Sequence, residues 1–122
     1  MISVSTEVSF EAAHHLPMMP EGHKCKRLHG HNWRVVITCE GPLDERGMVI
    51  DYYEIEKAWA LIYAEIDHRL LNEIPGLDNP TTEILASWLW ARLSTALPLH
   101  AIDVYETPRM HCRILGAPEQ EP

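Results

Sequence analysis

Three histidines have the side chains and the spacing to bind one metal ion: His14, His29 and His31. Because strand residues rise about 3.3 Å each, His29 and His31 would leave one strand face about 6.6 Å apart. His14 shares the apolar parity of the residues before it, whereas His15 would point the other way. Three neutral imidazoles leave one tetrahedral position open, as in catalytic zinc sites, and Mg²⁺ or Ca²⁺ would prefer oxygen ligands. We therefore predict a zinc site, the alternative being three unrelated histidines.

A cysteine close to these histidines is a candidate for catalysis. Cys25 lies four residues before His29, between Lys24 and Lys26. Neighbouring cations favour the thiolate, which is the reactive form of cysteine. We interpret Cys25 as catalytic, and two alternatives stay open. It could close the zinc site as a fourth, structural ligand, or it could be an inert loop residue.

Two further acidic positions have side chains that could do chemistry. Asp67 precedes His68, and a carboxylate can orient an imidazole and raise its basicity, so the pair is a predicted catalytic dyad. The alternative is a surface pair at the end of a helix. Glu106 shares the parity of apolar neighbours, and a buried carboxylate needs a partner. A ligand with adjacent N–H donors would serve, and so would an internal arginine. The arginines available for this are Arg34, Arg109 and Arg113.

The composition sets limits on partners and location. The chain has 122 residues, a formal charge of −8 and 46% hydrophobic residues, which is typical of a globular protein and argues against nucleic-acid binding. The basic segment 23–27 could still contact a small phosphate, or could be a solvated loop. We expect no membrane span and, because residues 1–7 lack the features of a signal peptide, a cytoplasmic location. An odd number of cysteines argues against a disulfide framework.

Apolar periodicity predicts the elements that position these residues. Strands are expected over 2–14 and 29–40, separated by a loop at 16–28 that is rich in proline. Two more strands are expected over 99–106 and 109–115. The alternation on each strand indicates one buried and one polar face, as in an antiparallel sheet.

Two helices are predicted between the two pairs of strands. Asp51 can cap the first, and Asn79 or Thr81 begins the second, which we expect to end at Pro98. The order ββααββ favours an α+β fold: a four-stranded antiparallel sheet with two helices on one face. We assign residues 1–116 to one domain and expect residues 117–122 to form a disordered tail.

Taken together, the motifs resemble those of the 6-pyruvoyltetrahydropterin synthase family. The motifs are Phe10-Glu11-Ala12-Ala13-His14, Cys25-x-x-x-His29-Gly30-His31, Asp67-His68 and Glu106-Thr107. The resemblance runs from the first strand to about residue 107. The spacing of three residues between Cys25 and His29 resembles that of the bacterial 6-carboxytetrahydropterin synthases. Segments 20–25 and 74–81 also resemble this branch.

The resemblance implies a fold, an assembly and a reaction. The fold would be the tunnelling fold, whose subunits pair their sheets into barrels, and the assembly a hexamer of two trimers with active sites between subunits. The substrate would be 7,8-dihydroneopterin triphosphate, and the products 6-carboxy-5,6,7,8-tetrahydropterin, acetaldehyde and triphosphate, on the route to queuosine and related deazapurines. The matching positions are His14, His29 and His31 for zinc, Cys25, Asp67 and His68 for catalysis, and Glu106 for anchoring the pterin.

These positions support a mechanistic hypothesis and leave three alternatives. Zinc would bind the substrate's side-chain hydroxyls and acidify the adjacent C–H, while Cys25 and His68 exchange protons and no nicotinamide or flavin is needed. Glu106 would accept two hydrogen bonds from the guanidine-like edge of the pterin. The alternatives are a pyruvoyl-forming synthase, an enzyme that cleaves the side chain of free dihydroneopterin or sepiapterin, and a non-catalytic zinc-stabilised oligomerisation module.

Overall fold

The strands and helices follow the expected order, with additions after the first helix. A computed structural model describes residues 1–116, so the predicted disordered tail lies outside the described residues. The elements are β1 (Ile2–His14), the 3₁₀ turn η1 (Lys24–Lys26), β2 (His29–Gly41), α1 (Tyr52–Ile66), β3 (Arg69–Leu70), the 3₁₀ turn η2 (Leu71–Glu73), α2 (Thr82–Leu93), β4 (Leu99–Thr107) and β5 (Met110–Leu115).

The sheet has five strands in the order β3-β1-β2-β4-β5, not the four that we expected. The long strands pair antiparallel, and β1 and β2 stay in register from Ile2 opposite Gly41 to His14 opposite His29. The additional strand, β3, pairs parallel to β1 at only two positions. Two residues are too few to show a hydrophobic period, which is why the sequence did not predict this strand.

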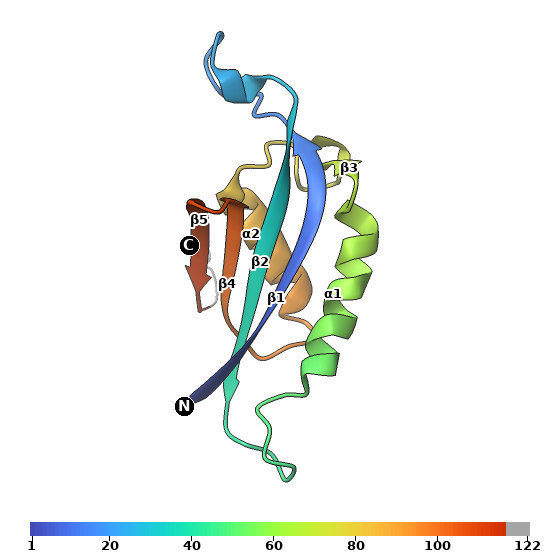
Figure 1. Cartoon of the computed structure of the whole chain (residues 1–122), viewed down its shortest axis with the longest axis vertical. Coiled ribbons are helices and arrows are strands. Elements are labelled where there is room, and N and C mark those ends of the chain that lie inside the picture. The colour runs from blue at the N-terminus through green and yellow to red at the C-terminus, as the bar shows by residue number, and fades with distance from the viewer. Residues whose placement is uncertain (117–122) are drawn as a thin grey trace.

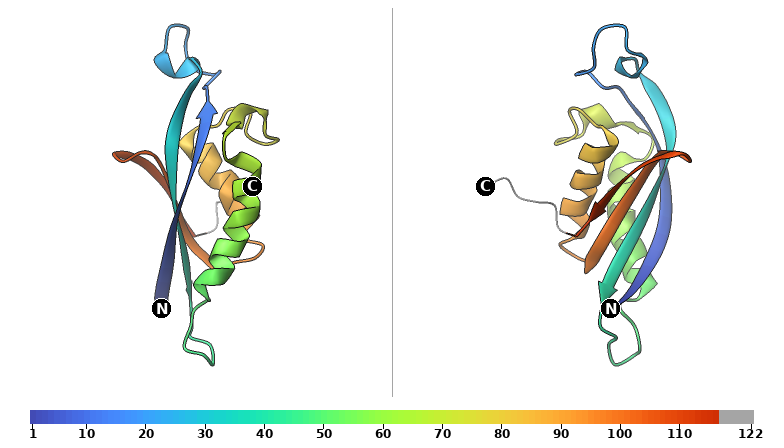
Figure 2. Two further views of the ribbon diagram at one scale, coloured as in Figure 1. Left: turned by 45° about the vertical axis from the view of Figure 1, so that its right-hand side comes forward. Right: turned by 90° about the vertical axis from the view of Figure 1, so that its left-hand side faces the viewer.

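Both helices cover the same face of the sheet (Figures 1 and 2). Each begins where a side chain caps it: Asp51 accepts a hydrogen bond from the backbone N–H of Tyr53, and Thr81 accepts one from Ile84. These bonds satisfy donors that a helix start leaves free. Between residues 1 and 116, neither helix has the length and apolar composition that a bilayer crossing needs.

The second helix is shorter than predicted. It ends at Leu93, five residues before Pro98, and the N–H of Ser94 still donates to the Trp90 carbonyl. Leu97 is buried even so, because the turn after the helix carries its side chain into the core. The apolar spacing therefore continues beyond the end of the helix. For this reason the prediction that the helix ends at Pro98 was wrong.

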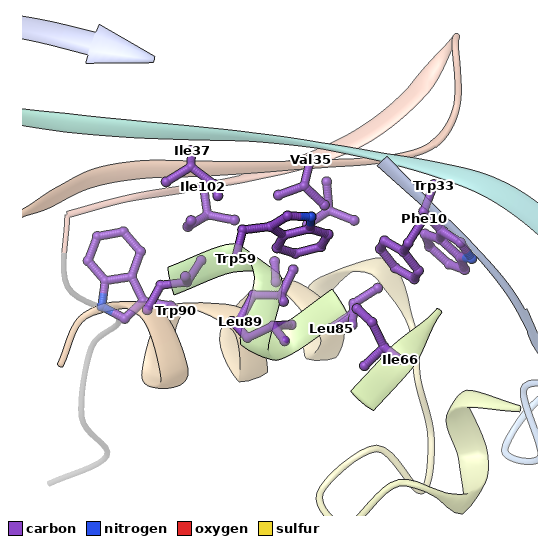
Figure 3. Close-up of a cluster of buried hydrophobic side chains, with 14 of the residues drawn as sticks. Phe10, Trp33, Val35, Ile37, Trp59, Ile66, Leu85, Leu89, Trp90 and Ile102 are labelled. Atoms are coloured by element: carbon purple, nitrogen blue, oxygen red, sulfur yellow. The ribbon is translucent and has the colours of Figure 1, made fainter. Parts of the chain in front are cut away.

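The hydrophobic core lies between the sheet and the helices (Figure 3). On β2, Trp33, Val35 and Ile37 have no exposed surface, and they face buried residues of both helices such as Trp59 and Leu89. His29 and His31 continue the same face of β2, since side chains alternate along a strand. Burial of the core residues therefore fixes the direction in which the two histidines point.

Candidate active site

The three predicted metal-binding histidines come together at one end of the β1–β2 pair. His14 lies directly opposite His29 in the antiparallel register, and His31 is two residues further along β2. Their ring centroids lie 4.5, 5.2 and 5.0 Å apart. Their donor atoms and a carboxylate oxygen of Glu106 all lie within 4.8 Å of one another. The parity of β1 and β2 thus brings the three histidines to one point, where Glu106 of β4 joins them as a fourth possible metal ligand.

Backbone carbonyls orient two of the rings. His14 Nδ1 is 2.9 Å from the carbonyl oxygen of Pro80, and His29 Nδ1 is 2.7 Å from that of Arg27. A carbonyl can only accept, so both Nδ1 atoms donate a proton and each Nε2 keeps its lone pair for a metal.

The remaining nitrogens fit a metal ion. Within residues 1–116, the Nε2 atoms of His14 and His31 are buried without a hydrogen-bond partner. A buried polar atom without a partner costs free energy, and a bound cation would remove that cost. A set of imidazole nitrogens with one carboxylate suits zinc.

Burial also favours the neutral, metal-binding form of two of these rings. Loss of hydration lowers the pKa of His14, and the bond to Pro80 opposes this. Loss of hydration likewise lowers the pKa of His31, while the Glu106 carboxylate raises it. Both rings also meet the buried Trp33 edge-on, at 4.9 and 5.3 Å between centroids. A neutral ring needs no deprotonation before it binds a metal.

Glu106 lies within the histidine cluster. Its Oε1 is 3.1 Å from His31 Nε2, and both side chains are mostly buried. In the β4–β5 hairpin Tyr105 pairs with His111 and Thr107 with Met110, so Glu106 is the extra residue of a bulge. A bulge re-aims a side chain, here toward the metal-binding atoms. The apolar parity of Glu106 predicted a partner for its carboxylate but gave no indication that the carboxylate lies among the possible metal ligands.

Two of the three arginines named as possible partners of Glu106 have other contacts. Arg113 donates to the buried carboxylate of Asp103 at 2.8 Å. Arg34 lies 3.5 Å from Glu7 and stacks over the ring of Tyr105. The imidazole cluster therefore takes the place that an internal arginine would have had.

Cys25 opens into the same cavity as the cluster. It is the middle residue of η1, where its backbone N–H donates to His23 Nδ1 at 3.0 Å. The cavity has a volume of about 370 Å³. Its lining residues are Lys24, Cys25, His29, His31, Glu106, Thr107 and Met110. Among the described residues, the donor atoms that lie within 4.8 Å of one another include Glu106 and exclude Cys25. Glu106 is therefore favoured over the cysteine as a fourth ligand.

Asp67 and His68 do form a pair. Asp67 Oδ2 lies 2.7 Å from His68 Nδ1, and Asp67 Oδ1 accepts the backbone N–H of Glu11 at 3.0 Å. The Glu11 carbonyl accepts the N–H of His68 in turn. His68 has a φ of 58°, which is uncommon for a residue other than glycine. The surrounding bonds thus hold the two side chains together at the junction of α1 and β3.

Hydrogen bonding shifts both pKa values in the direction of an ion pair. The bond from the Glu11 N–H, followed by that from His68, lowers the pKa of Asp67. The Asp67 carboxylate raises the pKa of His68. The nearby hydroxyl of Tyr63 also lowers the pKa of Asp67. The pair can therefore hold and release a proton at His68.

The Asp67–His68 pair lies outside the cavity that Cys25 lines. His68 borders a second hollow of about 590 Å³. The lining residues are Glu11, Ala12, Ala13, Gly30, His31, Asn32, His68, Arg69 and Leu70. These residues include both strand parities, and His31 also lines the cavity of Cys25. One chain therefore brings Cys25, His29, His31 and Glu106 into one cavity, with His14 buried in the same histidine cluster, but does not add Asp67 and His68 to it.

Known proteins share this sequence and architecture. Residues 3–117 match the family model for 6-pyruvoyl tetrahydropterin synthase. The chain belongs to this family. Within the family, a 6-carboxy-5,6,7,8-tetrahydropterin synthase of Synechocystis sp. is 44% identical over 110 residues, with 83% of each chain covered. A dihydroneopterin monophosphate aldolase of Pyrococcus furiosus is 37% identical over 90 residues, which cover 74% of this chain and 73% of that one.

A solved structure confirms the expected α+β tunnelling fold. The 6-pyruvoyl tetrahydropterin synthase of Caenorhabditis elegans superimposes with a TM-score of 0.86 at 25% sequence identity. The match covers 95% of this chain and 96% of that chain. The family resemblance seen in the motifs is thus confirmed over nearly the whole chain.

Proposed function

We propose that this chain is a zinc-dependent lyase that converts 7,8-dihydroneopterin triphosphate into 6-carboxy-5,6,7,8-tetrahydropterin, acetaldehyde and triphosphate. The observation that carries the proposal is the cluster of three convergent imidazoles and Glu106, which lies beside the cavity that Cys25 lines. The 44% identity to a protein named for forming this pterin supports the choice of reaction. The reaction would serve queuosine and deazapurine synthesis in the cytoplasm.

Each group in the cavity has a role in this proposal. His14, His29 and His31 hold zinc, which when bound supplies Lewis-acid polarisation of the substrate's hydroxylated side chain. Cys25, at the edge of the same cavity, removes a side-chain proton as a thiolate. Glu106 accepts two hydrogen bonds from the guanidine-like edge of the pterin. Lys24 lines the cavity and can meet the triphosphate, whereas Lys26 pairs with Glu21.

The position of Asp67 and His68 supports an active site shared between subunits. The pair acts as the second acid/base, and a neighbouring copy brings it to the cavity that Cys25 borders. Within the described residues, β3 pairs with β1 only at Ala12 and Ala13, so most of one β1 edge is open, as is the outer edge of β5. Open strand edges pair readily with another chain. We propose that they close a homo-oligomeric ring and that two trimers form a hexamer.

The test is product identification. The zinc-loaded protein is incubated with 7,8-dihydroneopterin triphosphate, and the products are analysed by mass spectrometry, with acetaldehyde measured separately. We expect 6-carboxy-5,6,7,8-tetrahydropterin and an equal amount of acetaldehyde. A pyruvoyl product without acetaldehyde would make the chain a pyruvoyl-forming synthase. Failure to convert any pterin, with unfolding on zinc removal, would support a non-catalytic zinc module.

A second candidate function is favoured by the dihydroneopterin monophosphate aldolase relative. In this case the chain would cleave the side chain of dihydroneopterin or its monophosphate. The same cavity could serve, because the pterin edge and the side-chain hydroxyls are common to these substrates. Measuring kcat/KM for the free, monophosphorylated and triphosphorylated substrates side by side separates the two functions. A preference for the free or monophosphorylated form would favour the aldolase.

A further inference from the structure

Glu106 and His31 are in close contact, but the contact does not have the geometry of a hydrogen bond. Oε1 and Nε2 are 3.1 Å apart, yet His31 Nε2 has no hydrogen-bond partner among residues 1–116. A carboxylate oxygen and an imidazole lone pair repel each other at this distance unless a cation lies between them. In a tetrahedral zinc site with bonds of 2.0–2.2 Å, two ligand atoms are about 3.3–3.6 Å apart. The separation of 3.1 Å is close to this range, and a small shift would place both atoms on one metal ion.

The other contacts agree with a fourth ligand. The Glu106 oxygen lies within 4.8 Å of the donor atoms of all three histidines. The bulge at Glu106 re-aims this side chain toward the cluster, and the carboxylate is mostly buried. One carboxylate with three imidazoles would complete a tetrahedral set for zinc.

A closed set of four protein ligands is typical of structural zinc sites, and catalysis needs an open position. Glu106 is also the proposed anchor for the pterin edge, and its carboxylate cannot fill both roles at once. We propose that Glu106 is an exchangeable ligand, which closes the metal site in the free enzyme and leaves it when a pterin binds. This inference rests on the proposed function, because it needs a ligand with a guanidine-like edge.

The exchange is chemically balanced. Glu106 gives up one coordination bond and gains two charge-assisted hydrogen bonds from the pterin. The released position becomes available only when substrate is in the cavity. Because coupling between two ligands is reciprocal, pterin must lower the affinity for zinc by the factor by which zinc lowers the affinity for pterin. This mutual weakening of zinc and pterin binding is expected for a pterin without side-chain hydroxyls, because such a pterin makes no metal contact of its own.

The first experiment measures zinc affinity by competition with a chelator. Glu106→Gln should bind zinc at least about tenfold more weakly than the unmodified protein, since loss of even an outer partner of a metal ligand costs that much. The matched control is Glu40→Gln, because Glu40 forms the same kind of pair with His100, at 2.6 Å, and lies at the other end of β2. The control should keep its zinc affinity. Circular dichroism checks that both variants fold.

The second experiment uses the cobalt-substituted protein, whose visible absorption reports the ligands. Pterin unsubstituted at position 6 is added, and its binding is measured by calorimetry. We expect the absorption spectrum of the unmodified protein to change when pterin binds. The spectrum of Glu106→Gln should differ from that of the unmodified protein before pterin is added, and should stay constant when pterin is added.

The outcomes separate this inference from the proposed function. Unchanged zinc affinity and an unchanged cobalt spectrum in Glu106→Gln would show that Glu106 is no ligand. Pterin binding that leaves the spectrum of the unmodified protein unaltered would make Glu106 a permanent ligand and overturn the exchange. Failure of the unmodified protein to bind pterin at all would instead overturn the proposed function, and the exchange with it.

Discussion

At the scale of single residues, strand parity was enough to find most of the cavity. His14, His29 and His31 converge because an antiparallel pair with one buried face leaves little choice of direction. Glu106 was singled out as a carboxylate that needs a partner, but its place among the histidines depends on a bulge. A bulge adds one residue without a clear pattern of residue types, so this part of the site could not be predicted from the sequence.

Replacement of the cysteine tests its role directly. Cys25→Ala should abolish turnover, because the proposed proton acceptor is gone, and should keep about one zinc per chain, because three imidazoles remain. Zinc content by atomic absorption and product formation are measured together. Cys112→Ala, a change at another half-buried cysteine, is the control and should stay active. Loss of zinc from Cys25→Ala would instead identify the cysteine as a ligand.

The Asp67–His68 pair gives a prediction for pH dependence. Since the carboxylate raises the pKa of His68, Asp67→Asn should lower that pKa toward its ordinary value. A histidine whose pKa is higher in the folded than in the unfolded state stabilises the protein fully at a pH below its unfolded pKa. This stabilisation is lost as the pH rises through the folded pKa. Asp67→Asn should therefore lower the melting temperature more at about pH 5.5 than at about pH 8.5. NMR titration of His68 checks the shift, and an identical titration in both proteins would contradict it.

At the scale of elements, the starts of helices were more predictable than their ends. Asp51 and Thr81 cap their helices with side-chain oxygens, a local interaction that the sequence displays. The end of α2 and the two-residue β3 depend on packing against other elements, which no local pattern records.

The cap of α2 also bears on the metal site. Thr81→Ala should lower the free energy of unfolding by about 1 kcal/mol, because the hydroxyl that accepts the Ile84 N–H is lost. The preceding residue, Pro80, supplies the carbonyl that orients His14, so zinc affinity should fall as well. Urea unfolding and chelator competition measure the two effects. Thr81→Ser keeps a hydroxyl and should resemble the unmodified protein. Equal stability of all three would rule out the cap as a support of the site.

At the scale of the whole molecule, one copy carries the proposed catalytic groups in two different hollows. Cys25 lines one of them, and His68 borders the other. Spacing along the sequence could not show this, because it does not tell which groups meet across a boundary between copies. Only the family resemblance predicted a site between subunits.

Mixing two inactive variants tests the shared site. Cys25→Ala and His68→Ala should each be inactive alone. After subunit exchange in equal amounts, about a quarter of the sites would combine an intact cysteine with an intact histidine, and activity should return to about that fraction. Native mass spectrometry confirms that mixed oligomers have formed. Mixed oligomers that stay inactive would place both residues in the site of one chain.

The pairing of His14 directly opposite His29 has a consequence for how the chain folds. A slip of one residue between β1 and β2 would turn the slipped strand's histidines to the opposite face and separate the ligands. Only a strand pair in the correct register would then bind the proposed zinc ion. Zinc binding would thus select correctly paired chains during folding, and chains with a shifted register would be the fraction that never acquires metal.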